Sequence, residues 1–185
     1  MLILASRSPR RRELLTLITD QFTVRPAEGD EIADPSLSPA RFVTELSAAK
    51  AREISADAPD DVVIGADTVV AFGKEILGKP RDTADAIRML TLLSGKTHSV
   101  FTGVTVIKNG EAHSFAEETR VTFFPLTDEE IGRYAESGEP LDKAGAYGIQ
   151  GAGALLVRGI EGDYYNVMGL PVGRLYRLLK ELKCI

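Results

Sequence analysis

One run of apolar and β-branched residues, at positions 61–72, constrains the fold more than any other stretch. Such a run is typical of an interior strand that is covered on both faces. Two polar residues, Asp67 and Thr68, interrupt it. Burial of a carboxylate costs several kcal/mol unless a partner or a metal ion offsets it, so Asp67 is a candidate functional residue. The alternative is a structural aspartate that accepts backbone hydrogen bonds at the strand end.

Signals for helices flank this strand. Ser8-Pro9 and Ser38-Pro39 each place an N-cap serine before a proline at the first helical position. They predict helices over 9–18 and from residue 39 onward, and the second helix carries Lys50. Cap and proline signals predict three more helices, over 82–95, 127–138 and from 171.

The remaining segments favour strands and turns. Short strands are expected at 2–5 and 22–25, and residues 99–107 and 111–124 form a hairpin signature around Asn109-Gly110. Glycines are dense over 139–169, where we expect tight turns around a site.

Charge is distributed unevenly along the chain. The sequence has 22 Lys and Arg against 27 Asp and Glu, a net charge of −5, which argues against duplex DNA and anionic membranes as partners. The first twelve residues nevertheless hold four arginines and no acid, at positions 7, 10, 11 and 12. A strand-to-helix turn already favours anions, so this cluster is interpreted as a phosphate-binding site, with a solvated basic turn as the alternative.

The chain shows no sign of export or membrane insertion. At the N-terminus the apolar residues precede the basic ones, the reverse of a secretory signal, and no apolar run could span a bilayer. The one cysteine, Cys184, cannot form an internal disulfide, which favours a reducing, cytoplasmic location. We expect a soluble protein.

Other candidate residues are ordinary in isolation. Lys50 and Lys79 match surface lysines, and Glu31 lies in an acidic loop where solvated carboxylates are common. Gln150 stands between glycines, which suits either a turn or an amide presented to a nucleobase edge. His98 and His113 are too few for a metal triad.

Several short motifs occur in order along the chain: Ala5-Ser6-Arg7-Ser8-Pro9-Arg10-Arg11, Gly65-Ala66-Asp67-Thr68, Gly78-Lys79-Pro80, the residues 93–99, and the stretches 142–151 and 162–171. Together they resemble the Maf family of nucleoside triphosphate pyrophosphatases. The resemblance implies an elongated α/β fold with a mixed sheet and flanking helices, similar to inosine triphosphate pyrophosphatases. It implies one domain over 1–185 with two lobes sharing a central cleft. It also implies hydrolysis of a nucleoside triphosphate to monophosphate and diphosphate with a divalent cation, Mg²⁺ or Mn²⁺.

The resemblance also implies roles for single residues. Asp67 matches the catalytic position, as the proton acceptor that activates water, and Glu31 with Asp67 matches metal-associated carboxylates. Whether Asp67 acts as base, as metal ligand or as both stays open. Phosphate contacts match Ser6, Arg10, Arg11, Lys50 and Lys79. Positions for substrate choice match Arg10, Thr68 and Gln150, of which the last two resemble the branch acting on dTTP and UTP.

A second hypothesis keeps the same site without turnover. Maf family members are associated with arrested septum formation, so the chain could be a nucleotide-binding regulator of cell division. An Asp67→Asn variant that retains a cellular effect would favour the regulator. In both cases the expected partner is a nucleoside triphosphate, with neither duplex nucleic acid nor membrane, and a homodimer is compatible with the sequence.

Overall fold

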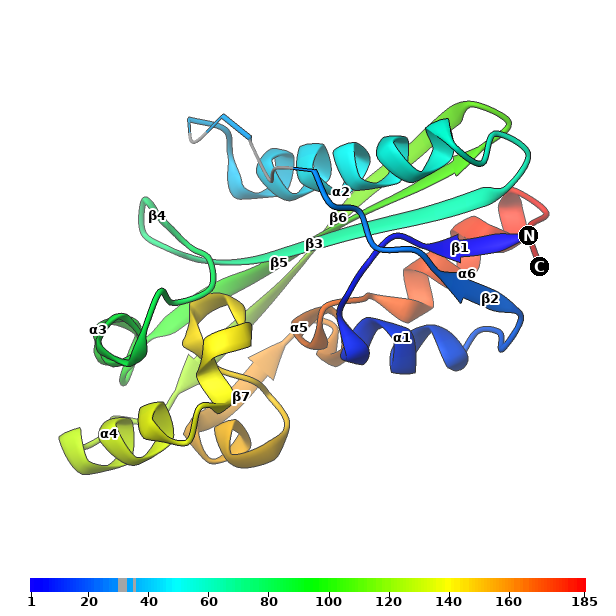
Figure 1. The fold of residues 1–185 in the computed structure, drawn as a ribbon. Coiled ribbons are helices and arrows are strands. Elements are labelled where there is room, and N and C mark those ends of the chain that lie inside the picture. The colour runs from blue at the N-terminus through cyan, green and yellow to red at the C-terminus, as the bar shows by residue number, and fades with distance from the viewer. Residues whose placement is uncertain (30–32, 35) are drawn as a thin grey trace. The chain divides into compact units, whose positions relative to one another are not determined.

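The computed structural model describes residues 1–29, 33–34 and 36–185 (Figure 1). The strands are β1 (Leu2–Leu4), β2 (Phe22–Val24), β3 (Val62–Phe72), β4 (Glu75–Leu77), β5 (Thr97–Lys108), β6 (Glu111–Phe123) and β7 (Val157–Glu161). The α-helices are α1 (Pro9–Thr16), α2 (Pro39–Ala56), α3 (Thr83–Leu93), α4 (Asp128–Glu136), α5 (Tyr164–Met168) and α6 (Val172–Glu181). Three short 3₁₀ helices are η1 (Glu139–Asp142), η2 (Ala144–Ala146) and η3 (Gly151–Leu156).

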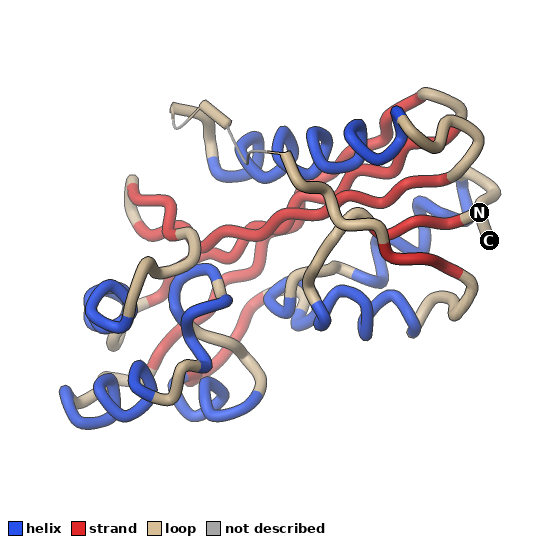
Figure 2. The backbone as a smooth tube through the Cα atoms, viewed as in Figure 1, coloured by secondary structure: helices blue, strands red, loops and turns tan. Residues whose placement is uncertain are grey.

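The strands of the described residues form one seven-stranded mixed sheet (Figure 2). Its order is β2-β1-β3-β5-β6-β7, and β4 pairs with β3. β1 runs parallel to β2 and β3, whereas the pairs β3–β4 and β6–β7 are antiparallel. The expected α/β class with a mixed sheet and flanking helices is confirmed. Within the described ranges, no helix is both long and apolar enough to cross a membrane.

The chain divides into two compact units. The first comprises residues 1–67, 102–117 and 169–185, and the second comprises 68–101 and 118–168. The division falls within β3, β5 and β6.

In the first unit, α2 packs directly against the sheet. A Cβ atom on Gly65 of β3 would lie 2.2 Å from the carbonyl oxygen of Ser47, and one on Gly103 of β5 would lie 2.3 Å from that of Val43. Only glycine permits so close an approach of helix and strand backbones. The buried hydroxyl of Ser47 also bonds to that of Thr105, at 2.9 Å. These contacts set the position of α2 along β3.

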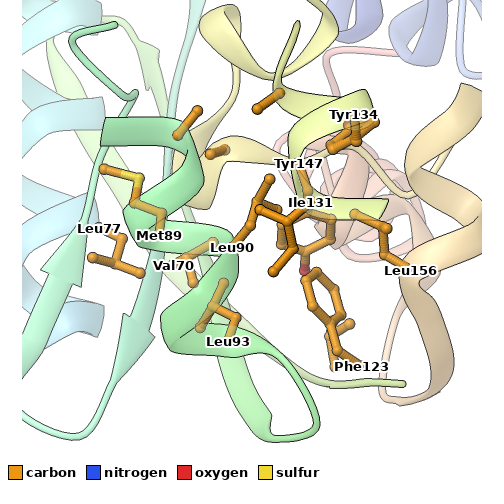
Figure 3. Close-up of a cluster of buried hydrophobic side chains, with 14 of the residues drawn as sticks. Val70, Leu77, Met89, Leu90, Leu93, Phe123, Ile131, Tyr134, Tyr147 and Leu156 are labelled. Carbon is orange, nitrogen blue, oxygen red and sulfur yellow. The ribbon is translucent and has the colours of Figure 1, made fainter. Parts of the chain in front are cut away.

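The second unit is built around a separate apolar core. Helices α3 and α4 pack together over a buried set of side chains that Figure 3 shows in close-up: Val70, Leu77, Leu90, Leu93, Phe123, Ile131, Tyr134, Tyr147 and Leu156. The ring of His98 meets those of Phe123 and Tyr147 edge-on, with centroids 5.0 and 5.3 Å away.

Most predicted helix starts and the hairpin are confirmed. Ser8 caps α1, Asp82 caps α3, and Thr127 forms a complete capping box at α4. The hairpin turn has the expected positive φ angles, 51° at Asn109 and 78° at Gly110. Helix α1 ends earlier than predicted, at Thr16, and β4, β7 and α5 were not predicted.

Candidate active site

Asp67 is buried in β3 and carries an ion pair. Its side chain lies 2.5 Å, Oδ1 to Nζ, from Lys50 of α2. Because side chains alternate along a strand, Asp67 points to the same face as Gly65, two residues earlier. At Gly65 the backbone of α2 lies against the strand at Ser47, and Lys50 follows one helical turn later. The glycine therefore makes the ion pair possible, by bringing the helix within reach of the carboxylate.

The pair explains how a charged group is tolerated in an apolar strand. The Lys50 side chain is 16% exposed and the Asp67 side chain 10%. Removing one partner of such a buried pair leaves an uncompensated charge, which costs about 3–5 kcal/mol. Lysine is thus the partner that the buried carboxylate requires, and an ammonium group stands beside the candidate catalytic residue.

The basic N-terminal segment folds as a strand, a turn and a helix, as expected. After β1, the Ser6 hydroxyl oxygen accepts hydrogen bonds from the Ser8 amide at 3.3 Å and from Nη1 of Arg11 at 3.2 Å. The Ser8 side chain accepts from the Arg11 amide and caps α1, whose first turn holds no acidic residue. Backbone N–H groups, the helix dipole and the arginines therefore all favour an anion at this turn.

Arg11 also has a structural role. Its Nε donates to the carbonyl oxygen of Gly169 at 2.8 Å, and Nη1 donates to that of Ala66 at 2.9 Å. Together with the bond to Ser6, these hydrogen bonds tie the guanidinium group to three other residues of the first unit. Ala66 precedes Asp67, so Arg11 joins the N-terminal turn to the middle of β3, next to the residue that carries the carboxylate.

The predicted phosphate-binding residues are divided between the two compact units. Ser6, Arg10, Arg11 and Lys50 belong to the first unit together with Asp67, where Arg10 is half-buried on α1. The exposed Lys79 belongs to the second unit, in the loop between β4 and α3.

The Lys79 loop is anchored on both sides. The Gly145 amide donates to the carbonyl oxygen of Gly78 at 3.0 Å. The buried Asp85 carboxylate accepts the Arg81 amide at 3.1 Å and Nε of Arg88 at 2.9 Å. These hydrogen bonds, that from the Arg81 amide foremost, hold the pKa of Asp85 below its usual value. The loop is therefore held in place while its lysine faces outward.

The predicted specificity residues Thr68 and Gln150 also belong to the second unit. Thr68 is half-buried in β3, directly after Asp67. Gln150 is exposed and occupies the position just before η3, where its side chain makes no capping hydrogen bond.

No metal centre is built from the described residues alone. Glu31, the expected second carboxylate, lies outside them, and the described residues hold no group of three or more His, Cys, Asp or Glu suited to a metal ion. His98 is instead a core residue, 3% exposed, with Nε2 2.8 Å from the Tyr147 hydroxyl. Burial lowers the pKa of His98 to about 4, so its ring is neutral at pH 7.

Comparison with solved structures shows the fold. The structure of a HAM1 protein from Coxiella burnetii superposes with a TM-score of 0.55, covering 97% of this chain and 98% of that one at 15% identity. The expected fold, similar to that of inosine triphosphate pyrophosphatases, is confirmed at this level.

Comparison with other sequences shows the family. A dTTP/UTP pyrophosphatase of Agathobacter rectalis is 52% identical over 200 residues, covering 98% of this chain and 97% of that protein. One of Bacillus pumilus is 52% identical over 179 residues, covering 97% and 95%. The family model for Maf-like proteins matches residues 1–182. The chain therefore belongs to the Maf-like protein family.

Proposed function

We propose that this protein hydrolyses dTTP and UTP to the nucleoside monophosphate and diphosphate. The observation that carries the proposal is the buried Lys50–Asp67 pair, in a unit that also contains an arginine-rich helix start. Relatives about half identical over nearly the whole chain bear the name dTTP/UTP pyrophosphatase. A cytoplasmic location is part of the proposal, because the substrates are used there.

The cationic residues bind the triphosphate. Arginine forks suit phosphate oxygens, and lysines add point charges. The predicted set is Ser6, Arg10, Arg11, Lys50 and Lys79. In phosphoryl transfer the protein chiefly positions groups and stabilises negative charge, so several cations around one carboxylate suit the reaction.

Asp67 is proposed to accept a proton from the attacking water. The water oxygen forms a bond to the α-phosphorus, while the bond from that phosphorus to the oxygen bridging the α- and β-phosphates breaks. The proton of the water passes to a carboxylate oxygen of Asp67. The diphosphate leaves with the electrons of the broken bond. Lys50, whose ammonium lies next to Asp67, is proposed to bind the incoming phosphates in addition to the carboxylate.

A divalent cation suits the donor chemistry of this site. Mg²⁺ is usually held by one or two carboxylates together with substrate phosphates, and Asp67 offers carboxylate oxygens. We assign Asp67 and Glu31 to Mg²⁺ or Mn²⁺, in addition to the role of Asp67 as base. When bound, such an ion neutralises phosphate charge and lowers the pKa of its water.

Arg10, Thr68 and Gln150 are proposed to select the nucleotide. The Gln150 amide can both accept from the N3–H and donate to the O4 of thymine or uracil, whereas a purine presents a different edge. Once a bound base covers the Gln150 amide, leaving that amide unpaired costs about 1–3 kcal/mol, which corresponds to roughly 5- to 150-fold in kcat/KM.

Turnover of dTTP, UTP, dATP, dGTP and 7-methyl-GTP, with Mg²⁺, Mn²⁺ or a chelator, tests this function. We expect diphosphate release mainly from dTTP and UTP, dependent on the cation. Asp67→Asn should fold and lose at least about 100-fold in kcat, whereas Asp57→Asn, an exposed aspartate at the end of α2, should match the wild type. Equal cleavage of purines, or an Asp67→Asn variant within tenfold of wild type, would contradict the proposal.

A further inference from the structure

The segment that carries Gln150 is tied to a buried tyrosine on its N-terminal side. The Gly148 amide donates to the hydroxyl oxygen of Tyr134 at 3.1 Å. Tyr134 belongs to α4 and is 5% exposed in the core of the second unit (Figure 3). Burial raises its pKa well above the usual value, so the hydroxyl keeps its proton and can donate onward. Gln150 follows two residues after this anchor point.

A carboxylate holds the same segment on its C-terminal side. Glu139 accepts the amides of Ala152 at 3.2 Å and Gly153 at 3.3 Å. Its Oε1 also accepts the Tyr134 hydroxyl at 3.0 Å. Tyr134 and Glu139 thus form one hydrogen-bonded pair, the Tyr134–Glu139 clamp, which holds backbone on both sides of Gln150.

Two glycines of the segment lie too close to Tyr134 and Glu139 to carry a side chain without a shift of the neighbouring atoms. A Cβ on Gly153 would lie 2.7 Å from the Tyr134 hydroxyl and 2.1 Å from the Gly148 carbonyl oxygen. Gly151 has φ +64°, and a Cβ there would lie 3.0 Å from Oε2 of Glu139. Side chains at either position would push the segment away from the pair, so the close turn and the clamp require each other.

We propose that Tyr134 and Glu139 are positioning residues that set the nucleobase preference by fixing the backbone around Gln150. This inference rests on the proposed function, in which Gln150 reads the base. An exposed amide discriminates between bases only if its donor and acceptor are held in one place before the ligand arrives. The clamp fixes the backbone from which the Gln150 side chain extends, through three hydrogen bonds from backbone amides, while neither clamp side chain needs to touch the nucleotide.

The test compares kcat/KM for dTTP and dGTP in five proteins. These are the wild type, Tyr134→Phe, Glu139→Gln, Gln150→Ala and the double variant Tyr134→Phe/Gln150→Ala. Loss of one or two of the hydrogen bonds of the clamp should lower the dTTP-to-dGTP ratio on the order of 3- to 10-fold. In the double variant Tyr134→Phe should change the ratio no further than Gln150→Ala alone, because it acts through Gln150.

Two matched controls separate positioning from general effects. Glu136→Gln, an exposed glutamate on α4, and Tyr176→Phe, on α6, should leave the ratio unchanged. Should Tyr134→Phe fail to fold, Glu139→Gln, which retains one acceptor oxygen, decides alone. An unchanged ratio in the clamp variants, or a Tyr134→Phe effect that adds to Gln150→Ala, overturns this inference while the proposed function stands. A wild type without preference for dTTP overturns both.

Discussion

Replacing Gly65 by alanine tests the arrangement that brings Lys50 to Asp67. The added Cβ would lie 2.2 Å from the Ser47 carbonyl oxygen and 2.9 Å from the Ala51 nitrogen, whereas ordinary contact begins at 3.4 Å. Helix α2 would therefore have to move by about 1 Å. Overpacking against rigid backbone costs about 1–3 kcal/mol, and this contact lies at the upper end. For a chain of this length, 3 kcal/mol corresponds to a fall in Tm of roughly 6–12 °C.

The same displacement should separate the ion pair, because Lys50 immediately precedes Ala51 on the helix. We expect kcat to fall along with Tm, measured by thermal unfolding and by diphosphate release below the transition. Gly132→Ala in α4 is the matched control, since a Cβ there meets nothing within 4 Å. It should raise stability by about 0.5–1 kcal/mol through the better helix propensity of alanine. A Gly65→Ala protein with wild-type Tm and kcat would refute the reasoning.

Three further outcomes follow from the same structure. Arg10→Ala and Lys79→Ala should chiefly raise KM for the triphosphate. Arg12 is exposed on α1, and Arg12→Ala should leave KM unchanged. An equal rise in KM at all three positions would indicate only a diffuse surface charge. Lys50→Met should lower the free energy of unfolding by about 3–5 kcal/mol in denaturant titrations, because it leaves the buried Asp67 without its ammonium; a change within error would show the pair to be dispensable. His98 has a folded pKa of about 4, below its unfolded value, so its contribution to stability is full above about pH 6.5 and is lost as the pH falls toward 4. His98→Gln should therefore flatten the stability profile over this range, and an unchanged profile would exclude His98 as its source.

The helix starts could be predicted because their signals are local. A capping side chain and a proline act within one turn, so Ser8-Pro9 and Ser38-Pro39 predict the first residues of α1 and α2. The Ser8 side chain forms the expected capping hydrogen bond, whereas Ser38 occupies the N-cap position of α2 without one. The Asn109-Gly110 turn could be predicted for a similar reason, since both residues tolerate positive φ angles.

Residues 139–169 could not be predicted in the same way. Here η1, η2 and η3 are held by side chains that bond to distant backbone, as Glu139 does to Ala152 and Gly153. Such bonds leave no hydrophobic period and no short motif in the sequence. The clamp residue Tyr134 was missed for this reason, because an apolar helix face explains it equally well.

One residue of the candidate site could be predicted from the sequence, but its ion-pair partner could not. Asp67 could be found because a lone carboxylate in an apolar strand needs a partner. The identity of that partner depends on how closely α2 approaches β3 at Gly65, a tertiary property that no local pattern near Lys50 encodes. The small residues Ser47 and Ala51, at helical spacing, are the signal that could have indicated it.

The hydrogen bond from Arg11 to Gly169 affects the order in which parts of the chain can fold. It joins residues 158 positions apart, so it is among the contacts that a folding chain closes with the greatest loss of loop entropy. During synthesis Arg11 emerges early, and its acceptor carbonyl at Gly169 emerges only after all seven described strands of the sheet have been translated. The arginine-rich turn can therefore reach its final geometry only late in translation, and a nascent chain acquires its anion-binding turn as one of its last features.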